Sequence, residues 1–204
     1  SYLAACSGAF HFTSRTNSFS GFSTRGLASF VPSRVKSAAD GASLFINIGT
    51  TTEAVSKALL DHKGLMVITN NINVANRMRV YPGIEVVIAG GVVRGSDGGI
   101  VGEAAVDFIK QFKVDYAVVG ASAIDHDGAL LDFDFREVKV AQAIVANARH
   151  VILVSDATKF ERTAPVRIGH LSQVNTFITD RCDIPAIQKI CQESDLSLEK
   201  PTFV

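Results

Sequence analysis

The segment Gly49, Thr50, Thr51 and Thr52 has residue types suited to binding an anion. It follows the apolar run 44–48 and precedes an amphipathic stretch. If these flanks form a strand and a helix, the backbone N–H groups lie at the positive end of the helix dipole, and three hydroxyls add donors. A phosphate monoester needs such donors, although the Lys and glycine spacing of a nucleotide P-loop are missing. Thr50 or Thr51 serving only as a helix N-cap is the alternative.

Two other polar or glycine-rich segments follow apolar runs. The amide of Asn70, in Thr69-Asn70-Asn71, could meet a sugar or polyol hydroxyl, or it could belong to an Asx turn or a helix cap. The glycine-rich stretch 90–102, which begins with Gly90 and Gly91, fits a close backbone approach to a ligand, a mobile flap or a simple hairpin.

The stretch 120–137 concentrates acidic residues, four aspartates and Glu137. Its spacing does not match a calcium loop, and His126 and His150 lack companions at metal-ligand spacing, so no metal site is expected. Glu137, near the start of a predicted helix, suits a general base or an anchor for ligand hydroxyls. It equally suits a first-turn acid that the helix dipole favours.

Lysines complete the candidate set. Lys159 follows the apolar run 151–154, so its ammonium could meet a phosphate at a strand end, and Lys139 is a second candidate. A plain surface lysine is the default alternative for both. No cysteine has a partner that would make it a nucleophile, and no Ser/His/Asp arrangement is readable, so we expect no catalytic residue.

The elements that must position these residues alternate along the chain. Apolar runs predict strands at 44–48, 65–69, 84–89, 114–120, 151–154 and 176–179, and amphipathic stretches predict helices at 53–61, 73–80, 103–111, 136–148 and 185–192. Apolar strands alternating with helices indicate an α/β fold whose mostly parallel sheet is covered on both faces. Ligands bind such sheets outside the carboxyl ends of the strands.

Composition sets further bounds. The chain has 204 residues, 47% of them hydrophobic, with 20 Lys+Arg against 20 Asp+Glu. This balance argues against a nucleic-acid binder along the whole chain, and no apolar run approaches the ~18 residues of a membrane span. Three cysteines fit a reducing compartment. We therefore expect a soluble cytoplasmic protein without a membrane partner.

Residues 1–39 differ from the rest of the chain. They carry Arg15, Arg25, Arg34 and Lys36, no acidic residue, and many serines and phenylalanines without a helical or strand period. We interpret them as a disordered leader or one added during cloning. The composition of an organellar transit peptide and a basic arm for DNA phosphates are the alternatives.

Several segments, taken in order, resemble the effector domain of DeoR-type bacterial transcriptional repressors. They are FINIGTTTEAVSKALL, ITNNINVANRM, VVIAGGVVRGSDGGIVGEAAVDFI, VDYAVVGASAIDHDGALLDFDFREVKVAQAI and ARHVILVSDATKFERTAPVRIGHLSQVNTFITD. The resemblance runs from about Asp40 to Asp180. It places the effector-sensing α/β domain at 40–204, after an unmatched leader at 1–39.

The resemblance implies a sugar-phosphate-isomerase-like fold (NagB, ribose-5-phosphate isomerase and CoA transferase type) that works as a sensor. Its effector would be a phosphorylated metabolite, glycerol 3-phosphate or a sugar phosphate, that relieves repression. Operator DNA would be bound through an N-terminal winged helix domain, which residues 1–39 do not resemble. A homodimer or homotetramer without a cofactor is implied as well.

The resemblance also assigns roles by position. Gly49 to Thr52 would hold the phosphate, and Lys159 would reach the phosphate or an adjacent hydroxyl. The other implied site residues line the pocket, follow the glycine-rich flap or surround the polyol: Asn70, Gly90, Gly91, Gly102, Glu103, Asp125, Glu137 and Lys139. Two positions depart from the family pattern, Asn47 in place of the usual Asp and Glu161 in place of a common Gly.

Two other functions stay open. The implied fold is shared with ribose-5-phosphate isomerases. If the chain were an enzyme of that type, Glu137 would abstract a proton from the sugar phosphate. The loop 121–124 lacks the carboxylates that those enzymes carry there, so groups to stabilise an enediolate are missing. The third hypothesis is an interaction module that assembles subunits and senses nothing.

Overall fold

A central parallel sheet organises the molecule. The computed structural model describes residues 40–200, so the predicted leader lies outside the described part. Seven strands pair in the order β12-β11-β9-β6-β1-β2-β3, and every pair is parallel. Their bounds are β1 (Ser43–Ile46), β2 (Leu65–Thr69), β3 (Ile84–Ile88), β6 (Val114–Val119), β9 (Ala148–Val154), β11 (Thr176–Ile178) and β12 (Ser197–Glu199).

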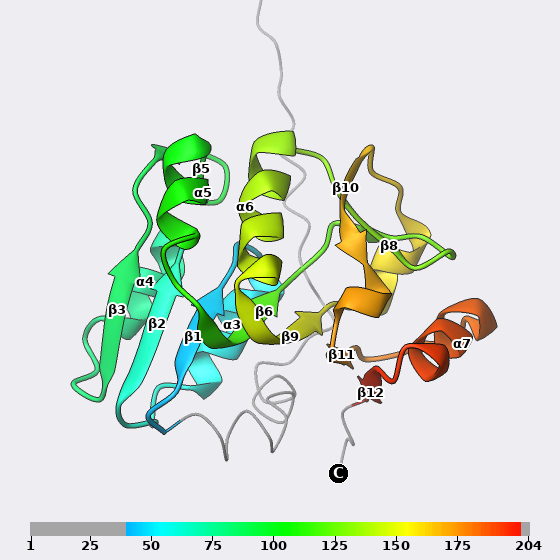
Figure 1. Cartoon of the computed structure of the whole chain (residues 1–204), viewed down its shortest axis with the longest axis horizontal. Helices are drawn as coiled ribbons and strands as arrows, with labels where there is room; N and C mark the ends of the chain where they lie inside the picture. The colour runs from blue at the N-terminus through cyan, green and yellow to red at the C-terminus, as the bar shows by residue number, and fades with distance from the viewer. Residues whose placement is uncertain (1–39, 201–204) are drawn as a thin grey trace, which may run out of the picture.

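Helices cover both faces of this sheet, which confirms the predicted α/β architecture. Figure 1 shows α5 (Glu103–Ile109) and α6 (Phe135–Ala146) in front of the strands, with α3 (Thr50–Ala58) and α4 (Ile72–Met78) behind them. The alternation of β1 fits this arrangement. Leu44 and Ile46 belong to one apolar cluster with Val55 and Val74, while Phe45 packs in the other with Ile144. The remaining helices are η1 (Ala157–Glu161), η2 (Leu171–Gln173) and α7 (Pro185–Glu193).

Two small antiparallel sheets add to this frame. The acidic stretch after β6 folds into the hairpin of β7 (Ala123–Ile124) and β8 (Ala129–Asp132), and β10 (Val166–His170) pairs with β8. The glycine-rich stretch forms a second hairpin, β4 (Val92–Val93) with β5 (Ile100–Val101). The sequence left this stretch open among three interpretations, and the hairpin is the one that the structure shows.

The start of the first helix differs from its prediction. Helix α3 begins at Thr50 rather than at residue 53, so the polar turn is shorter than expected. Threonines are poor helix formers, but the Thr52 hydroxyl lies 2.7 Å from both Asn47 O and Gly49 O and holds this first turn. The polar turn is therefore part of the helix N-terminus.

Two absences concern the residues that the structure describes. Within residues 40–200 no helix combines the length and apolarity needed to cross a membrane. The same residues contain no group of three or more His, Cys, Asp or Glu side chains arranged to hold a metal ion.

Candidate functional site

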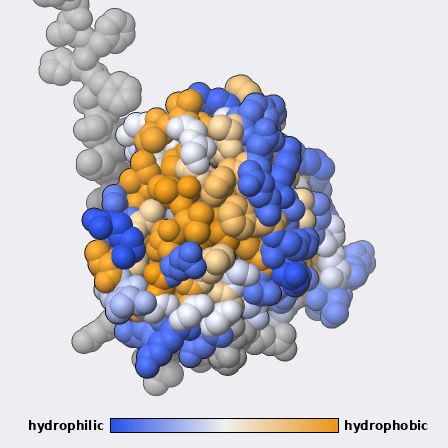
Figure 2. All heavy atoms as spheres, turned by 60° about the vertical axis from the view of Figure 1, so that its left-hand side comes forward, coloured by the Kyte–Doolittle hydropathy of each residue, from blue (hydrophilic) through white to orange (hydrophobic). Residues whose placement is uncertain are grey.

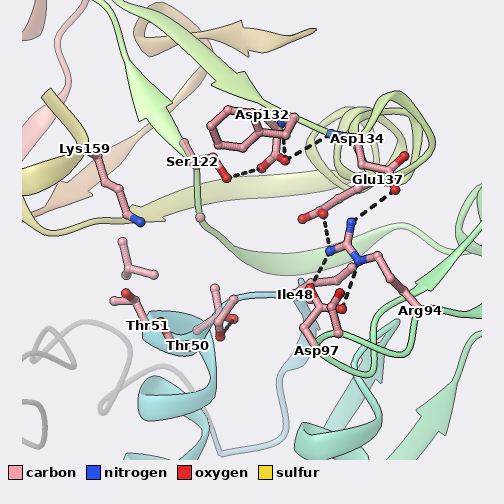
Figure 3. A pocket seen from close by; sticks show the side chains of 17 residues that line it. Ile48, Thr50, Thr51, Arg94, Asp97, Ser122, Asp132, Asp134, Glu137 and Lys159 are labelled. Atoms are coloured by element: carbon pink, nitrogen blue, oxygen red, sulfur yellow. Dashed lines mark hydrogen bonds and ion pairs between the residues drawn. The ribbon is translucent and has the colours of Figure 1, made fainter. Parts of the chain in front are cut away.

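A cavity of about 320 Å³ opens at the carboxyl ends of the central strands. It lies where the loops after β1, β6 and β9 meet the β4–β5 hairpin and the start of α6, and Figure 3 shows the side chains that line it. The volume suits a small metabolite. The lining residues are Ile48, Gly49, Thr50, Thr51, Thr52, Arg94, Ser96, Asp97, Gly120, Ala121, Ser122, Asp132, Phe133, Asp134, Glu137, Val154 and Lys159.

One end of the cavity is the N-terminus of α3. The N-cap residue is Gly49, with φ of 138°, a left-handed value that favours glycine, and no side chain caps the helix. The interpretation of Thr50 or Thr51 as the N-cap is therefore wrong. Among the described residues neither of their hydroxyls has a hydrogen-bond partner. The helix start thus presents backbone N–H groups and two hydroxyls to the cavity.

The ammonium of Lys159 faces the same end. Its side chain comes from η1 and points toward Thr51 in Figure 3. It makes no ion pair or hydrogen bond with any other residue in the described part of the chain. Burial lowers the pKa of Lys159, although the nearby charges of Asp156 and Asp132 favour the charged form. A half-buried, unpaired ammonium is costly, and an anion bound beside it would offset that cost.

The opposite end of the cavity is a network of carboxylates around Arg94. This arginine leaves the β4–β5 hairpin and contacts Asp97 and Glu137 at 2.5 Å each and Asp134 at 3.3 Å. Burial, with help from the charge of Asp132, raises the pKa of Glu137 to about 7 even though Arg94 opposes the shift. Arg136 also bonds Asp134, at 2.9 Å, so the three acid groups of the network outnumber its two arginines.

Asp132 ends β8 at the wall between the two halves. Its Oδ2 accepts a hydrogen bond from the Ser122 hydroxyl at 2.9 Å, and its Oδ1 accepts one from the Phe133 N–H at 2.6 Å. These bonds fix the carboxylate in place while it lines the cavity. The site therefore combines a fixed acid group with the Arg94 network.

Several of the residues predicted from the sequence meet in this cavity, and several do not. Gly49, Thr50, Thr51, Thr52, Glu137 and Lys159 all line it. The others lie elsewhere: Asn70, Gly90, Gly91, Gly102, Glu103, Asp125 and Lys139 are not among the lining residues.

The residues outside the cavity have local partners. The Asn70 side chain donates to Ile100 O at 3.1 Å, so it ties β2 to the hairpin. Glu103 and Lys139 form an exposed ion pair of 2.6 Å between α5 and α6. Asp125 lies in the β7–β8 turn, where its carbonyl accepts from the Gly128 N–H at 2.9 Å. The next residue after Asn70, Asn71, caps α4 as one of the sequence interpretations proposed.

The sequence reasoning missed much of the acidic end. Arg94, Ser96, Asp97, Ser122, Asp132, Phe133 and Asp134 line the cavity but were not candidates. The signal available in the sequence was a possible charge pairing. Arg94 is the one basic residue in the glycine-rich stretch 90–102, and the stretch 120–137 is acidic without the spacing of a metal site. Just before the polar segment 49–52, Asn47 is buried, and its Oδ1 has no hydrogen-bond partner among the described residues.

Comparison with known proteins agrees with the resemblance. The chain is 46% identical over 160 residues to the glycerol-3-phosphate regulon repressor of Escherichia coli (strain K12), covering 78% of this chain and 64% of that protein. It is 51% identical over 146 residues to the repressor of the same name from Haemophilus influenzae, covering 72% and 56%. The chain thus spans about three fifths of the curated relatives it matches, and both are named as repressors, not enzymes.

Solved structures match this chain at low sequence identity. The eIF2B beta structure from Chaetomium thermophilum matches 76% of this chain and 47% of that chain with a TM-score of 0.52 and 16% identity. Ribose 5-phosphate isomerase A from Neisseria gonorrhoeae matches 67% and 52% with a TM-score of 0.45 and 11% identity.

A protein-family model covers most of the residues that the structure describes. The model described as "DeoR C terminal sensor domain" matches residues 33–181. This range contains the strands, loops and helices that build the cavity, from Ile48 to Lys159. The chain belongs to the DeoR C-terminal sensor domain family.

Proposed function

We propose that this chain senses a phosphorylated small molecule in the cavity and thereby relieves repression by a DeoR-type repressor. The observation that carries the proposal is the unpaired ammonium of Lys159 against the start of α3, which no side chain caps. The two groups together supply a cation, backbone N–H donors and hydroxyls, the set that a phosphate monoester needs. The names of the relatives favour glycerol 3-phosphate as the effector.

Operator binding belongs to the whole repressor in this proposal. A winged helix domain preceding the sensor would contact DNA in the cytoplasm, and the effector would shift the population of subunit arrangements. Coupling free energies of this kind are typically about 1–3 kcal/mol, enough to weaken operator affinity by roughly 5- to 150-fold.

Assembly with a second copy of the chain is part of the proposal. Figure 2 shows a broad apolar area on the side of the molecule where β3 and the β4–β5 hairpin lie. Ile88, Val92 and Val93 are 44%, 64% and 52% exposed there, and we call these residues the β3–β4 apolar surface. Strand β3 is the edge of the sheet and holds neither lysine nor proline to protect it, so a two-fold contact with the same edge of another copy fits this face.

Titration calorimetry with glycerol 3-phosphate tests the sensor function. The chain is expected to bind the ester, and Lys159→Ala is expected to weaken binding by about tenfold or more, because the phosphate loses the cation at its end of the cavity. Lys139→Ala is the matched control, since Lys139 pairs with Glu103 outside the cavity. No binding at millimolar concentration would defeat the proposal, and equal losses in both variants would defeat the placement of the phosphate.

A further inference from the structure

The charged groups of the cavity are separated along its length. At one end, the start of α3 and Lys159 offer hydrogen-bond donors and a positive charge. At the other end, Arg94 contacts three carboxylates, those of Asp97, Asp134 and Glu137, and Arg136 bonds Asp134 at 2.9 Å. The carboxylate of Asp132 lines the cavity beside this network. The two ends therefore attract opposite charges.

Arg94 has few donors left for a ligand. Its Nε donates to Asp97 Oδ1 at 2.9 Å, and its Nη1 donates to Asp134 Oδ2 at 3.3 Å. Its Nη2 donates to Asp97 Oδ2 and Glu137 Oε2, each at 2.5 Å. These contacts use four of the about five N–H groups of a guanidinium. Arg94 thus has one N–H group left and is surrounded by carboxylates, whereas the ammonium of Lys159 has no hydrogen-bond or ion-pair partner among the described residues.

Acceptors at the acidic end remain open to a ligand. The Oε1 of Glu137 has no hydrogen bond to any described residue, while its Oε2 is held by Arg94. Asp132 is fixed toward the cavity by the Ser122 hydroxyl. Carboxylate oxygens in this position accept hydrogen bonds from hydroxyl groups and repel other anions.

We propose that the acidic end is a specificity filter, with Asp132 and Glu137 as its specificity-determining residues. It accepts monophosphate esters whose remaining chain is neutral and carries hydroxyls. It rejects esters that carry a carboxylate or a second phosphate at that end. The inference rests on the proposed function, because it requires the phosphate at the Lys159 end.

Two esters that differ at one terminal carbon provide the test. Glycerol 3-phosphate carries a hydroxymethyl group where 3-phosphoglycerate carries a carboxylate. Calorimetry on the 204-residue chain at pH 8 is expected to show at least about tenfold weaker binding of 3-phosphoglycerate, because its carboxylate would lie beside the buried acids Asp132 and Glu137.

Variants then identify the source of the discrimination. Asp132→Asn and Glu137→Gln are each expected to strengthen 3-phosphoglycerate binding. Each variant should therefore reduce the ratio of the dissociation constants of 3-phosphoglycerate and glycerol 3-phosphate. Asp107→Asn is the matched control, since Asp107 is exposed on α5 and pairs with Lys110 outside the cavity. An unchanged ratio in both cavity variants, with thermal unfolding showing an intact fold, would overturn the assignment of the filter to these residues.

The comparison of the two esters uses the unmodified chain, so its outcome does not depend on whether a variant folds. Equal affinities for both esters would overturn the filter and leave the proposed function standing, because a phosphate ester would still bind. Failure of both esters and of inorganic phosphate to bind would overturn the proposed function, and the filter with it.

Discussion

At the scale of single side chains, burial in the cavity favours the neutral form of both a base and an acid. It lowers the pKa of Lys159 and raises the pKa of Glu137 to about 7. The first group lacks a partner among the described residues, and the second shares one arginine with other carboxylates. Groups in a cleft whose pKa is shifted by burial are typical of binding sites, and here geometry and pKa indicate the same cavity.

The shifted acid makes stability depend on pH. Glu137 releases its proton near pH 7 in the folded chain and near pH 4.5 when unfolded. Between these values the folded state binds more protons, so this group lowers the free energy of unfolding as pH rises, and its effect is complete above pH 7. The full shift corresponds to on the order of 3 kcal/mol.

Glu137→Gln is expected to remove this contribution. Urea unfolding at pH 5 and pH 8 should show a smaller loss of stability toward pH 8 in the variant than in the unmodified chain. Glu103→Gln makes the same change on the exposed surface and serves as the control. A pH 5 to pH 8 difference identical to that of the unmodified chain would show that Glu137 is ionised in the folded state.

At the scale of elements, the starts of two helices beside β1 and β2 have different roles. Helix α3 begins after a glycine and has no side-chain cap, so its first N–H groups face the cavity. Helix α4 begins after Asn71, whose Oδ1 accepts from the N–H groups of Asn73 and Val74 at 2.9 and 3.3 Å. The Asn71 amide also donates to Glu53 Oε1 at 3.1 Å, which joins α4 to α3. One helix start is therefore structural and the other is available to a ligand.

Asn71→Ala tests the structural role. The variant is expected to lose about 1–2 kcal/mol of stability, because the cap and the link to Glu53 both disappear. Urea unfolding measures the loss. Asn76→Ala lies on the same helix with an exposed side chain, and it is expected to be neutral or slightly stabilising because alanine is the better helix former. Equal effects of the two changes would contradict a capping role for Asn71.

At the scale of the whole molecule, the cavity and the β3–β4 apolar surface share one hairpin. Val92 and Val93 form β4 on the exposed side, and Arg94, the next residue, reaches into the acidic network. A ligand that changes the contacts of Arg94 would act on residues directly bonded to the proposed interface. This continuity gives a short physical route from effector to assembly.

Ile88→Asp and Val92→Asp are expected to convert an assembled chain into monomers, because a charge would be buried at the two-fold contact. Sedimentation analysis measures the change in mass. Gln192→Asp adds the same charge on α7 at the opposite edge of the sheet and should leave assembly intact. A chain that is monomeric without any substitution, or assembled in all three variants, would contradict this interface.

The sequence by itself determined the parallel sheet, its helices and the polar segment 49–52 at the start of the first helix. Those features depend on local pattern: apolar runs such as 114–119, helical periodicity, and a glycine that allows the positive φ at position 49. Only the tertiary structure decided that Arg94 meets Glu137, 43 positions later in the chain, and that Lys139 pairs with Glu103 instead of lining the cavity. Side-chain contacts across such distances depend on how hairpin and helix pack together, and local sequence pattern carries no record of that packing.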